Sequence, residues 1–292
     1  MVKKHGAKDI ASTDYIISNF AGPYVKLGLL ICSLVGVLFP LYWLLLSAFK
    51  LESDHRSYPP VFIPREITFD HFIEVFTQNQ LLENLTNSTI ISIITTFITL
   101  LIGSMAAYAV QRGSLGKKTR TLFGLWFMVQ KMYPAIATAI PVYLVMRSLR
   151  LIDTLTAMII MNTSFNLPLV IWLMMGFFEQ IPYELEESAM LDGSSFVHRF
   201  FHVILPITKP GLVASAILTF TATWNEFLFA VILSINKAKT LPVVIAGFIT
   251  DRGLAWGPMA ATSMVTLVPV VILTLLVQKD FVKGMALGAV KG

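Results

Sequence analysis

The sequence predicts an all-α membrane protein with six transmembrane helices, both termini in the cytoplasm, and one helical hairpin that projects into the cytoplasm. Three observations lead to this fold class. Of the 292 residues, 55% are hydrophobic and only 13% are charged, whereas soluble domains carry about 25% charged residues. Six largely uncharged stretches are long enough to cross the hydrocarbon core, which takes about 20 residues. Lysine and arginine are also distributed unevenly between the segments that connect these stretches.

The six predicted spans follow one another without a linker, a low-complexity tract or an internal repeat, so residues 1–292 are expected to form a single membrane domain. The apolar run of the first span is longer than the roughly 7–15 residues of a secretory signal, which predicts an uncleaved helix. Cys32 is the one cysteine of the chain, which excludes an internal disulfide. The spans cover about 27–49, 86–111, 121–146, 154–178, 210–235 and 257–278.

The basic residues predict which side of the membrane each connecting segment occupies. Six spans place both termini on the same side. Of the 22 lysines and arginines, 13 lie in the termini and in the second and fourth connecting segments, and eight lie in the other segments. Because cytoplasmic segments carry the excess of basic residues, we expect both termini in the cytoplasm.

Two of the connecting segments on the expected outer face have structural features of their own. In residues 50–83, Thr68 can cap a short helix whose Phe69, Phe72, Ile73 and Phe76 share one side. That helix either lies on the membrane surface or docks an external partner, and its periodicity fits both. Residues 234–258 form a second outer loop, which is interrupted by prolines and glycines.

The run EESAMLDGSSFVHRFFHVILP is acidic and half polar although it lies between apolar spans. Its first part consists of good helix formers, and Gly193 can take the left-handed conformation that ends a helix. Ser194 or Ser195 can cap a second helix. That helix carries an apolar stripe at positions i, i+3, i+4 and i+7. The stripe consists of Val197, Phe200, Phe201 and Ile204. Residues 182–206 are therefore expected to form a helix–turn–helix hairpin.

The acidic side chains of this hairpin indicate whether it contacts the membrane surface or a protein. A hairpin lying flat in the headgroups usually carries lysine and arginine on its polar face. The first helix instead carries Glu184, Glu186 and Glu187, and Asp192 follows it. Anionic headgroups would repel these carboxylates, which favours a protein partner over the membrane surface.

The spacing of the hairpin residues resembles the EAA signature of ABC importer permeases, with Ser188 in place of the first alanine. Three further stretches resemble the carbohydrate branch of that family: IPYELEESAMLDG, TFTATWNEFL and the closing FVKGMALGAVKG. The similarity extends over all six spans and implies the type I ABC importer permease fold. The residues in register with the signature are Glu187, Ala189, Gly193, Val203, Leu205 and Pro206.

The resemblance implies that the hairpin is a coupling helix, which inserts into a groove of a cytoplasmic ATPase. The implied docking residues are Glu187, Ser188, Ala189, Asp192, Gly193 and Ser194, with Leu205 and Pro206 setting the angle at the fifth span. Val290, Lys291 and Gly292 would be a further ATPase contact. The implied partners are a second, related permease in a heterodimer, two ATPase subunits, and an external solute-binding protein. The implied location is the bacterial inner membrane.

Polar residues inside the spans are candidates for the substrate pathway, because charges in the membrane are costly and usually functional. Lys131 either reaches the inner headgroups, pairs with Glu226, or meets an anionic substrate such as an alginate oligosaccharide. Trp224, Asn225 and Glu226 either line the pathway or form hydrogen bonds between helices. In the resembled family, the position that corresponds to Lys131 is commonly uncharged. The lysine of this chain departs from that pattern, which favours an acidic saccharide as the substrate.

The sequence carries no nucleotide site of its own. RGSLGKKT at 112–119 lacks the glycine at 111 and the Ser or Thr at 118 of a phosphate loop. The chain is therefore expected to be a transport subunit and not an enzyme, with ATP and magnesium used by its partners and no role for nucleic acid. His198 and His202 have a zinc-like spacing but no third ligand, so no metal is expected.

A self-sufficient secondary carrier for a small polar solute is the alternative. Such carriers usually show internal repeats and paired ionisable groups near mid-membrane. The sequence shows no evident repeat and one acidic residue in mid-span, which favours the importer subunit.

Overall fold

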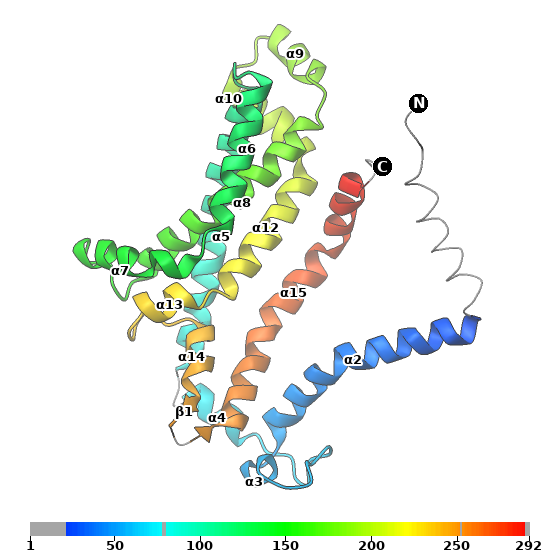
Figure 1. Ribbon diagram of the computed structural model, residues 1–292, viewed down its shortest axis with the longest axis vertical. Helices are drawn as coiled ribbons and strands as arrows, with labels where there is room; N and C mark the ends of the chain where they lie inside the picture. The colour runs from blue at the N-terminus through cyan, green and yellow to red at the C-terminus, as the bar shows by residue number, and fades with distance from the viewer. Residues whose placement is uncertain (1–21, 78–79, 252, 290–292) are drawn as a thin grey trace, which may run out of the picture.

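The computed structural model describes residues 22–77, 80–251 and 253–289, and this part of the chain is almost entirely helical (Figure 1). Four of its helices are long and apolar enough to cross a membrane. They coincide with the first, second, fourth and sixth predicted spans. These helices are α2 (Pro23–Phe49), α5 (Leu81–Arg112), α8 (Leu155–Glu179) and α15 (Trp256–Ala289).

Helices α5, α8 and α12 (Lys209–Trp224) pack against one another at the centre, and α15 contacts both α12 and α2 (Figure 1). Two glycines permit this close packing because a side chain would collide with a neighbouring helix. A Cβ atom at Gly103 would lie 2.7 Å from Cγ1 of Val170, and one at Gly211 would lie 2.5 Å from the ring of Phe177. By contrast, α2 leans away from this group and is buried mainly near its C-terminal end.

The third predicted span, 121–146, is not one continuous helix. Helix α6 (Lys117–Met132) ends before Pro134, a 3₁₀ turn follows over Ala135–Thr138, and α7 (Ala139–Ser148) continues the chain. Tyr133 has an extended conformation with ψ of 130°, because the ring of a following proline disfavours the helical conformation. Figure 1 shows α7 projecting sideways from the central helices.

The fifth predicted span, 210–235, is also interrupted. Helix α12 ends at Trp224, and a short helix α13 (Leu228–Leu233) starts again after three residues. No proline or glycine lies at this break. Polar side chains stabilise the two helix ends instead: Asn225 donates a hydrogen bond back to the carbonyl of Thr221, and the Glu226 carboxylate accepts bonds from α13.

The segments predicted on the outer face fold into short elements at one end of the molecule (Figure 1). The predicted cap is present, since Thr68 Oγ1 accepts a hydrogen bond of 3.1 Å from the Asp70 N–H. A β-hairpin pairs Ile249 with Leu254 and Thr250 with Gly253. The elements are α3 (Glu52–His55), α4 (Asp70–Thr77), α14 (Leu241–Gly247), β1 (Ile249–Thr250) and β2 (Gly253–Leu254).

Asp153 ties the segment before α8 to the loop that follows α13. Its carboxylate accepts hydrogen bonds of 2.9 to 3.1 Å from four successive backbone N–H groups, those of residues 235–238. Burial alone would raise the pKa of Asp153, but these N–H groups favour the charged form and hold the pKa below its ordinary value. Asp153 thus holds the N–H groups of this loop, and Asn87 donates hydrogen bonds to its carbonyls at Lys237 and Lys239.

Candidate functional site: the helical hairpin and the polar residues of the helices

The segment between α8 and α12 forms two short helices joined by a tight turn. Helix α9 (Glu184–Leu191) ends at Gly193, whose φ of +79° is the left-handed conformation predicted for it. Ser195 Oγ then accepts a hydrogen bond from the His198 N–H and caps α10 (Phe196–Arg199). A wide π turn over Phe200–Ile204 and a single turn α11 (Leu205–Ile207) complete the hairpin.

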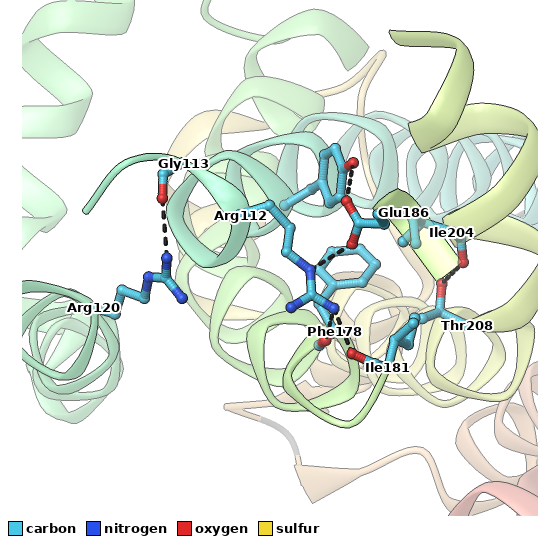
Figure 2. A network of polar contacts seen from close by, with 9 residues as sticks. Arg112, Gly113, Arg120, Phe178, Ile181, Glu186, Ile204 and Thr208 are labelled. Atoms are coloured by element: carbon cyan, nitrogen blue, oxygen red, sulfur yellow. Dashed lines mark hydrogen bonds and ion pairs between the residues drawn. The ribbon is translucent and has the colours of Figure 1, made fainter. Parts of the chain in front are cut away.

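The hairpin meets α12 at a sharp angle. The segment Phe196–Ile207 and helix α12 are bent by 81° with respect to each other. The bend falls at Thr208, whose hydroxyl donates a 3.0 Å hydrogen bond to the Ile204 carbonyl (Figure 2). Pro206 and Pro210 flank this position and lack the N–H groups that would extend one straight helix through it. A change in the direction of the hairpin must therefore act on α12 at this bend.

A buried ion pair fixes the base of the hairpin to the end of α5. Arg112 Nε lies 2.6 Å from a carboxylate oxygen of Glu186, and the two side chains are 10% and 3% exposed. The other carboxylate oxygen accepts a 2.8 Å hydrogen bond from the hydroxyl of Tyr108. Figure 2 shows the guanidinium between Glu186 and the end of α8. Both charges are thus removed from water and paired with each other.

The same arginine also connects the base of the hairpin to α8. Its Nη2 group donates hydrogen bonds of 2.9 Å to the Phe178 carbonyl and 2.7 Å to the Ile181 carbonyl. The last carbonyls of a helix have no partner within the helix and carry partial negative charge, so a buried guanidinium is well placed there. Arg112 therefore joins three elements, α5, α8 and α9.

Aromatic packing reinforces this junction. Phe200 and Ile204 are buried in one cluster with Tyr108 and Phe178, and the rings of Tyr108 and Phe200 lie 5.1 Å apart. The sequence predicted that Val197 and Phe201 would share this face, but they are 60% and 38% exposed. The wide turn explains the difference, because its i→i+5 hydrogen bonds place fewer degrees of rotation between successive residues than an α-helix does.

The outward side of the hairpin is exposed in this chain. Most of the residues assigned to docking on the EAA resemblance lie there. Glu187, Ser188, Asp192, Gly193 and Pro206 are exposed, and Ala189, Ser194 and Leu205 are partly buried. The side chain of Leu191 is 89% exposed, although burial of a leucine side chain is favourable. The tip thus combines carboxylates with apolar side chains, as a protein-binding surface does.

The polar residues predicted to lie inside spans have local partners. Glu226 accepts hydrogen bonds from the N–H groups of Phe229 at 2.7 Å and Ala230 at 3.0 Å. Lys131 donates to the Phe165 carbonyl at 3.2 Å and to Asn166 Oδ1 at 3.4 Å. The alternative in which Lys131 pairs with Glu226 is therefore wrong for the described residues, because Lys131 bonds to α8 and Glu226 bonds to α13.

The three adjacent pathway candidates differ in exposure. Trp224 is 2% exposed and packs in the cluster that includes Ala48, Leu241 and Ala261, so it does not face an opening in this chain. Asn225 is exposed and Glu226 is partly exposed. The break between α12 and α13 thus presents an amide and a carboxylate. Val290, Lys291 and Gly292, the predicted C-terminal contact, lie outside the described residues.

Sequence reasoning missed the residues that hold the hairpin in place. Arg112 was counted only as a basic residue of a connecting segment, and Glu186 only as one of several acids on a polar face. Tyr108 was not singled out. The one available signal was an acidic residue inside an otherwise apolar helical face, together with an arginine at the end of a span. Sequence distance hides the pairing, since 74 residues separate Arg112 from Glu186.

Sequence comparison identifies the class of membrane subunit to which this chain belongs. Residues 99–279 match the family described as the inner membrane component of binding-protein-dependent transport systems. This chain belongs to that family of ABC importer permeases, which are non-catalytic membrane subunits.

Characterised relatives extend over nearly the whole chain. The sulfoquinovosyl glycerol transport system permease of Agrobacterium fabrum is 32% identical over 284 residues, covering 97% of this chain and 99% of the relative. The trehalose transport system permease of Mycobacterium tuberculosis is 36% identical over 258 residues, covering 87% and 93%. Similarity at this level and coverage supports the family assignment independently of the hairpin.

Solved structures share the fold. A bacterial ABC transporter involved in the import of the acidic polysaccharide alginate matches with a TM-score of 0.75 and 21% identity, covering 96% of this chain and 100% of that one. The MetNI methionine transporter matches with a TM-score of 0.57 and 16% identity, covering 75% and 99%. The second match is to a transporter of an amino acid, so the fold alone does not fix the substrate.

Proposed function

We propose that this chain is a permease subunit of an ATP-driven, binding-protein-dependent importer of sugars or oligosaccharides, and that it forms half of the translocation pathway. The main observation that supports this proposal is the hairpin, which is anchored at its base by a buried ion pair and exposed at its tip. The names of the relatives support a sugar substrate, since they refer to trehalose, diacetylchitobiose and sulfoquinovosyl glycerol.

Six membrane crossings are part of this proposal. Helices α2, α5, α8 and α15 account for four. Helix α6 has 16 residues, about 24 Å at 1.5 Å per residue, and is too short for about 30 Å of hydrocarbon. The 3₁₀ turn over Ala135–Thr138 would lengthen this crossing by about 8 Å at 2.0 Å per residue, and α12 with the break after it would form the remaining crossing. Both termini and the hairpin would then be cytoplasmic, in the inner membrane of a bacterium.

The partners follow from the surfaces that this chain leaves exposed. The hairpin tip would dock one of two ATPase subunits, which bind and hydrolyse ATP with magnesium. The exposed apolar surfaces of α2 and α6 would contact lipid and a second, related permease. The short elements beside α4 and the β-hairpin would face an external solute-binding protein. Residues 1–292 would act as one domain in this complex.

Coupling would work by moving the hairpin as a rigid unit. Closure of the ATPase dimer would push the tip, where Glu187, Ser188, Ala189, Asp192, Gly193 and Ser194 lie. The ion pair between Arg112 and Glu186 would transmit this displacement to α5 and α8. The 81° bend after Leu205 and Pro206 would transmit it to α12. The central cavity would open alternately to each side.

The substrate pathway is proposed at the break between α12 and α13. Asn225 and Glu226 are exposed there to different degrees, and amide and carboxylate groups suit the hydroxyl groups of a saccharide. Trp224, which is buried next to them in the sequence, would hold this part of α12 in place by packing. Lys131 supports an anionic substrate such as an alginate oligosaccharide, and its present bonds to Phe165 and Asn166 would be exchanged for bonds to a substrate carboxylate.

Transport in proteoliposomes tests the proposal. The chain would be reconstituted with the second permease, the ATPase and the binding protein encoded beside it, with ATP sealed inside the vesicles. We expect uptake of labelled saccharide only when all four components and ATP are present. The matched control contains this chain alone under a proton or sodium gradient. Uptake in that control would overturn the proposal in favour of the secondary carrier.

A further inference from the structure

Three side chains that can bind a metal ion converge at the end of the molecule opposite the hairpin (Figure 1). Glu52 and His55 lie on α3, three residues apart, and His71 lies on α4. Each offers one ligand atom, and these three atoms lie within 4.8 Å of one another. This cluster is not visible in the sequence, because His71 follows His55 by 16 positions.

His71 is held in the form that binds a metal. Its ring is buried, and Nε2 lies 2.8 Å from the backbone carbonyl of Lys50. A carbonyl oxygen only accepts hydrogen bonds, so Nε2 is the donor and Nδ1 is the ring nitrogen that remains for a ligand. A metal-binding histidine almost always donates its other ring N–H in this way. A Cβ atom at Gly257 would overlap the His71 ring, so the glycine leaves the space that the ring occupies.

His55 has a ring nitrogen that the protein leaves unsatisfied. Its Nε2 atom is buried and has no hydrogen-bond partner among the described residues. The centroids of the His55 and His71 rings are 6.1 Å apart. Buried polar atoms are nearly always bonded, and a metal ion is one group that would satisfy this nitrogen.

Glu52 is free to complete the set. Its carboxylate makes an exposed contact of 3.4 Å with Arg56, and exposed pairs of this kind contribute little. With His71 and Glu74, it lines a cavity of about 340 Å³ beside β2 and the start of α15. The cavity leaves room for water to occupy a further coordination position.

We propose that Glu52, His55 and His71 bind a zinc ion. Two imidazoles and one carboxylate suit zinc better than magnesium or calcium, which prefer all-oxygen ligands. Three protein ligands plus water make a four-coordinate site. Tetrahedral bonds of about 2.0–2.1 Å place ligand atoms roughly 3.4 Å apart, so the side chains of the exposed helix α3 close in on the ion. Bound zinc would fasten α3 to α4 and to the start of α15.

Zinc binding to the purified full-length chain, in complex with its partners, tests this site. The complex would carry a tag without histidines and would be stripped with a chelator. Zinc would then be titrated in competition with a chromophoric chelator, and cobalt absorption would report the ligand geometry. We expect one zinc per chain at this site. Glu52→Gln and His55→Gln should each weaken binding by more than about 10-fold. Both change side chains that are not fully buried, so the fold should survive.

A matched control comes from the other histidine pair of the chain. His198 and His202 stack with ring centroids 4.2 Å apart on the hairpin, and the double variant His198→Gln/His202→Gln should bind zinc like the wild type. Gly257→Ala should weaken binding without removing any ligand, because the added methyl group displaces the His71 ring. Absence of stoichiometric binding, binding unaffected by His55→Gln and Glu52→Gln, or binding lost in the hairpin double variant would each overturn the proposal.

Discussion

The base of the hairpin and the break between α12 and α13 each place a carboxylate next to apolar helices, but they satisfy it differently. Glu186 pairs with an arginine from another helix, and that arginine also binds the end of a third. Glu226 bonds to N–H groups of the helix that follows it, those of Phe229 and Ala230. The first arrangement joins separate elements, whereas the second stabilises one helix end, so we expect α12 and α13 to reorient more easily than the base of the hairpin. In the proposed mechanism, the hairpin base that receives the ATPase movement is therefore the rigid region. The break between α12 and α13, where the substrate would pass, is the more adaptable one.

Breaking the ion pair should have the largest effect. Glu186→Ala leaves the Arg112 guanidinium buried without its counter-charge, and such changes cost about 3–5 kcal/mol. Denaturant unfolding of the purified chain should show this loss, and ATP-driven uptake should fall with it. Glu187→Ala is the matched control: this neighbouring glutamate is exposed, so stability should change by less than about 0.5 kcal/mol.

A double variant sharpens the interpretation of that result. Arg112→Met/Glu186→Met replaces both charges with apolar side chains, which is often neutral for a buried pair. We expect it to recover most of the stability lost in Glu186→Ala. Because methionine cannot bond to the carbonyls of Phe178 and Ile181, coupling of ATP hydrolysis to uptake should remain impaired. Full recovery of coupled transport would contradict the role assigned to Arg112.

Removing the helix cap at the break should have a smaller effect. Glu226→Ala deletes the acceptor of two N–H groups of α13, and a lost cap costs about 1 kcal/mol. The same unfolding measurement should detect this change. Asn225→Ala is a fitting comparison, because Asn225 bonds only to the preceding turn. A loss as large as that of Glu186→Ala would show that the break is as rigid as the hairpin base.

The loop fixed by Asp153 gives a pH-dependent prediction. The pKa of Asp153 is lowered in the folded chain, so the unfolded chain, in which this carboxyl group has its ordinary pKa, binds the proton at higher pH. The stabilisation is complete above that value and is lost as the pH falls through the folded pKa. Asp153→Asn should therefore lower the melting temperature at pH 7 and have little effect at the acidic end. An equal effect at both pH values would contradict this mechanism.

Lys131→Met should change stability least, because the lysine makes only two long hydrogen bonds to α8. Its effect should appear in selectivity. We expect the KM for an alginate oligosaccharide to rise while the KM for a neutral saccharide of similar length stays unchanged. Uptake assays with both substrates check this, and an equal change for both would remove the argument for an anionic substrate.

The sequence predicts elements whose signals are local. Long apolar runs predicted four of the spans, and Gly193 and Thr68 predicted a turn and a cap that the structure contains. The apolar run over 121–146 predicts one span although it contains Pro134, so hydropathy alone does not reveal the break after Met132. The interruption after Trp224 has no proline or glycine to reveal it. Pairings between distant residues, such as Arg112 with Glu186 or His55 with His71, depend on packing that one sequence does not display.

Crosslinking at the hairpin tip tests the central claim most directly. Leu191→Cys, in a chain with Cys32→Ser, would be expressed with the ATPase encoded beside it, and a matched cysteine at Tyr58 would serve as the control, since Tyr58 is 96% exposed on the segment proposed to face outward. We predict a crosslink from residue 191 to the ATPase whose yield changes when ATP is added, and none from residue 58. An assembled complex in which residue 191 forms no crosslink in any nucleotide state would contradict the assignment of the hairpin as the coupling element.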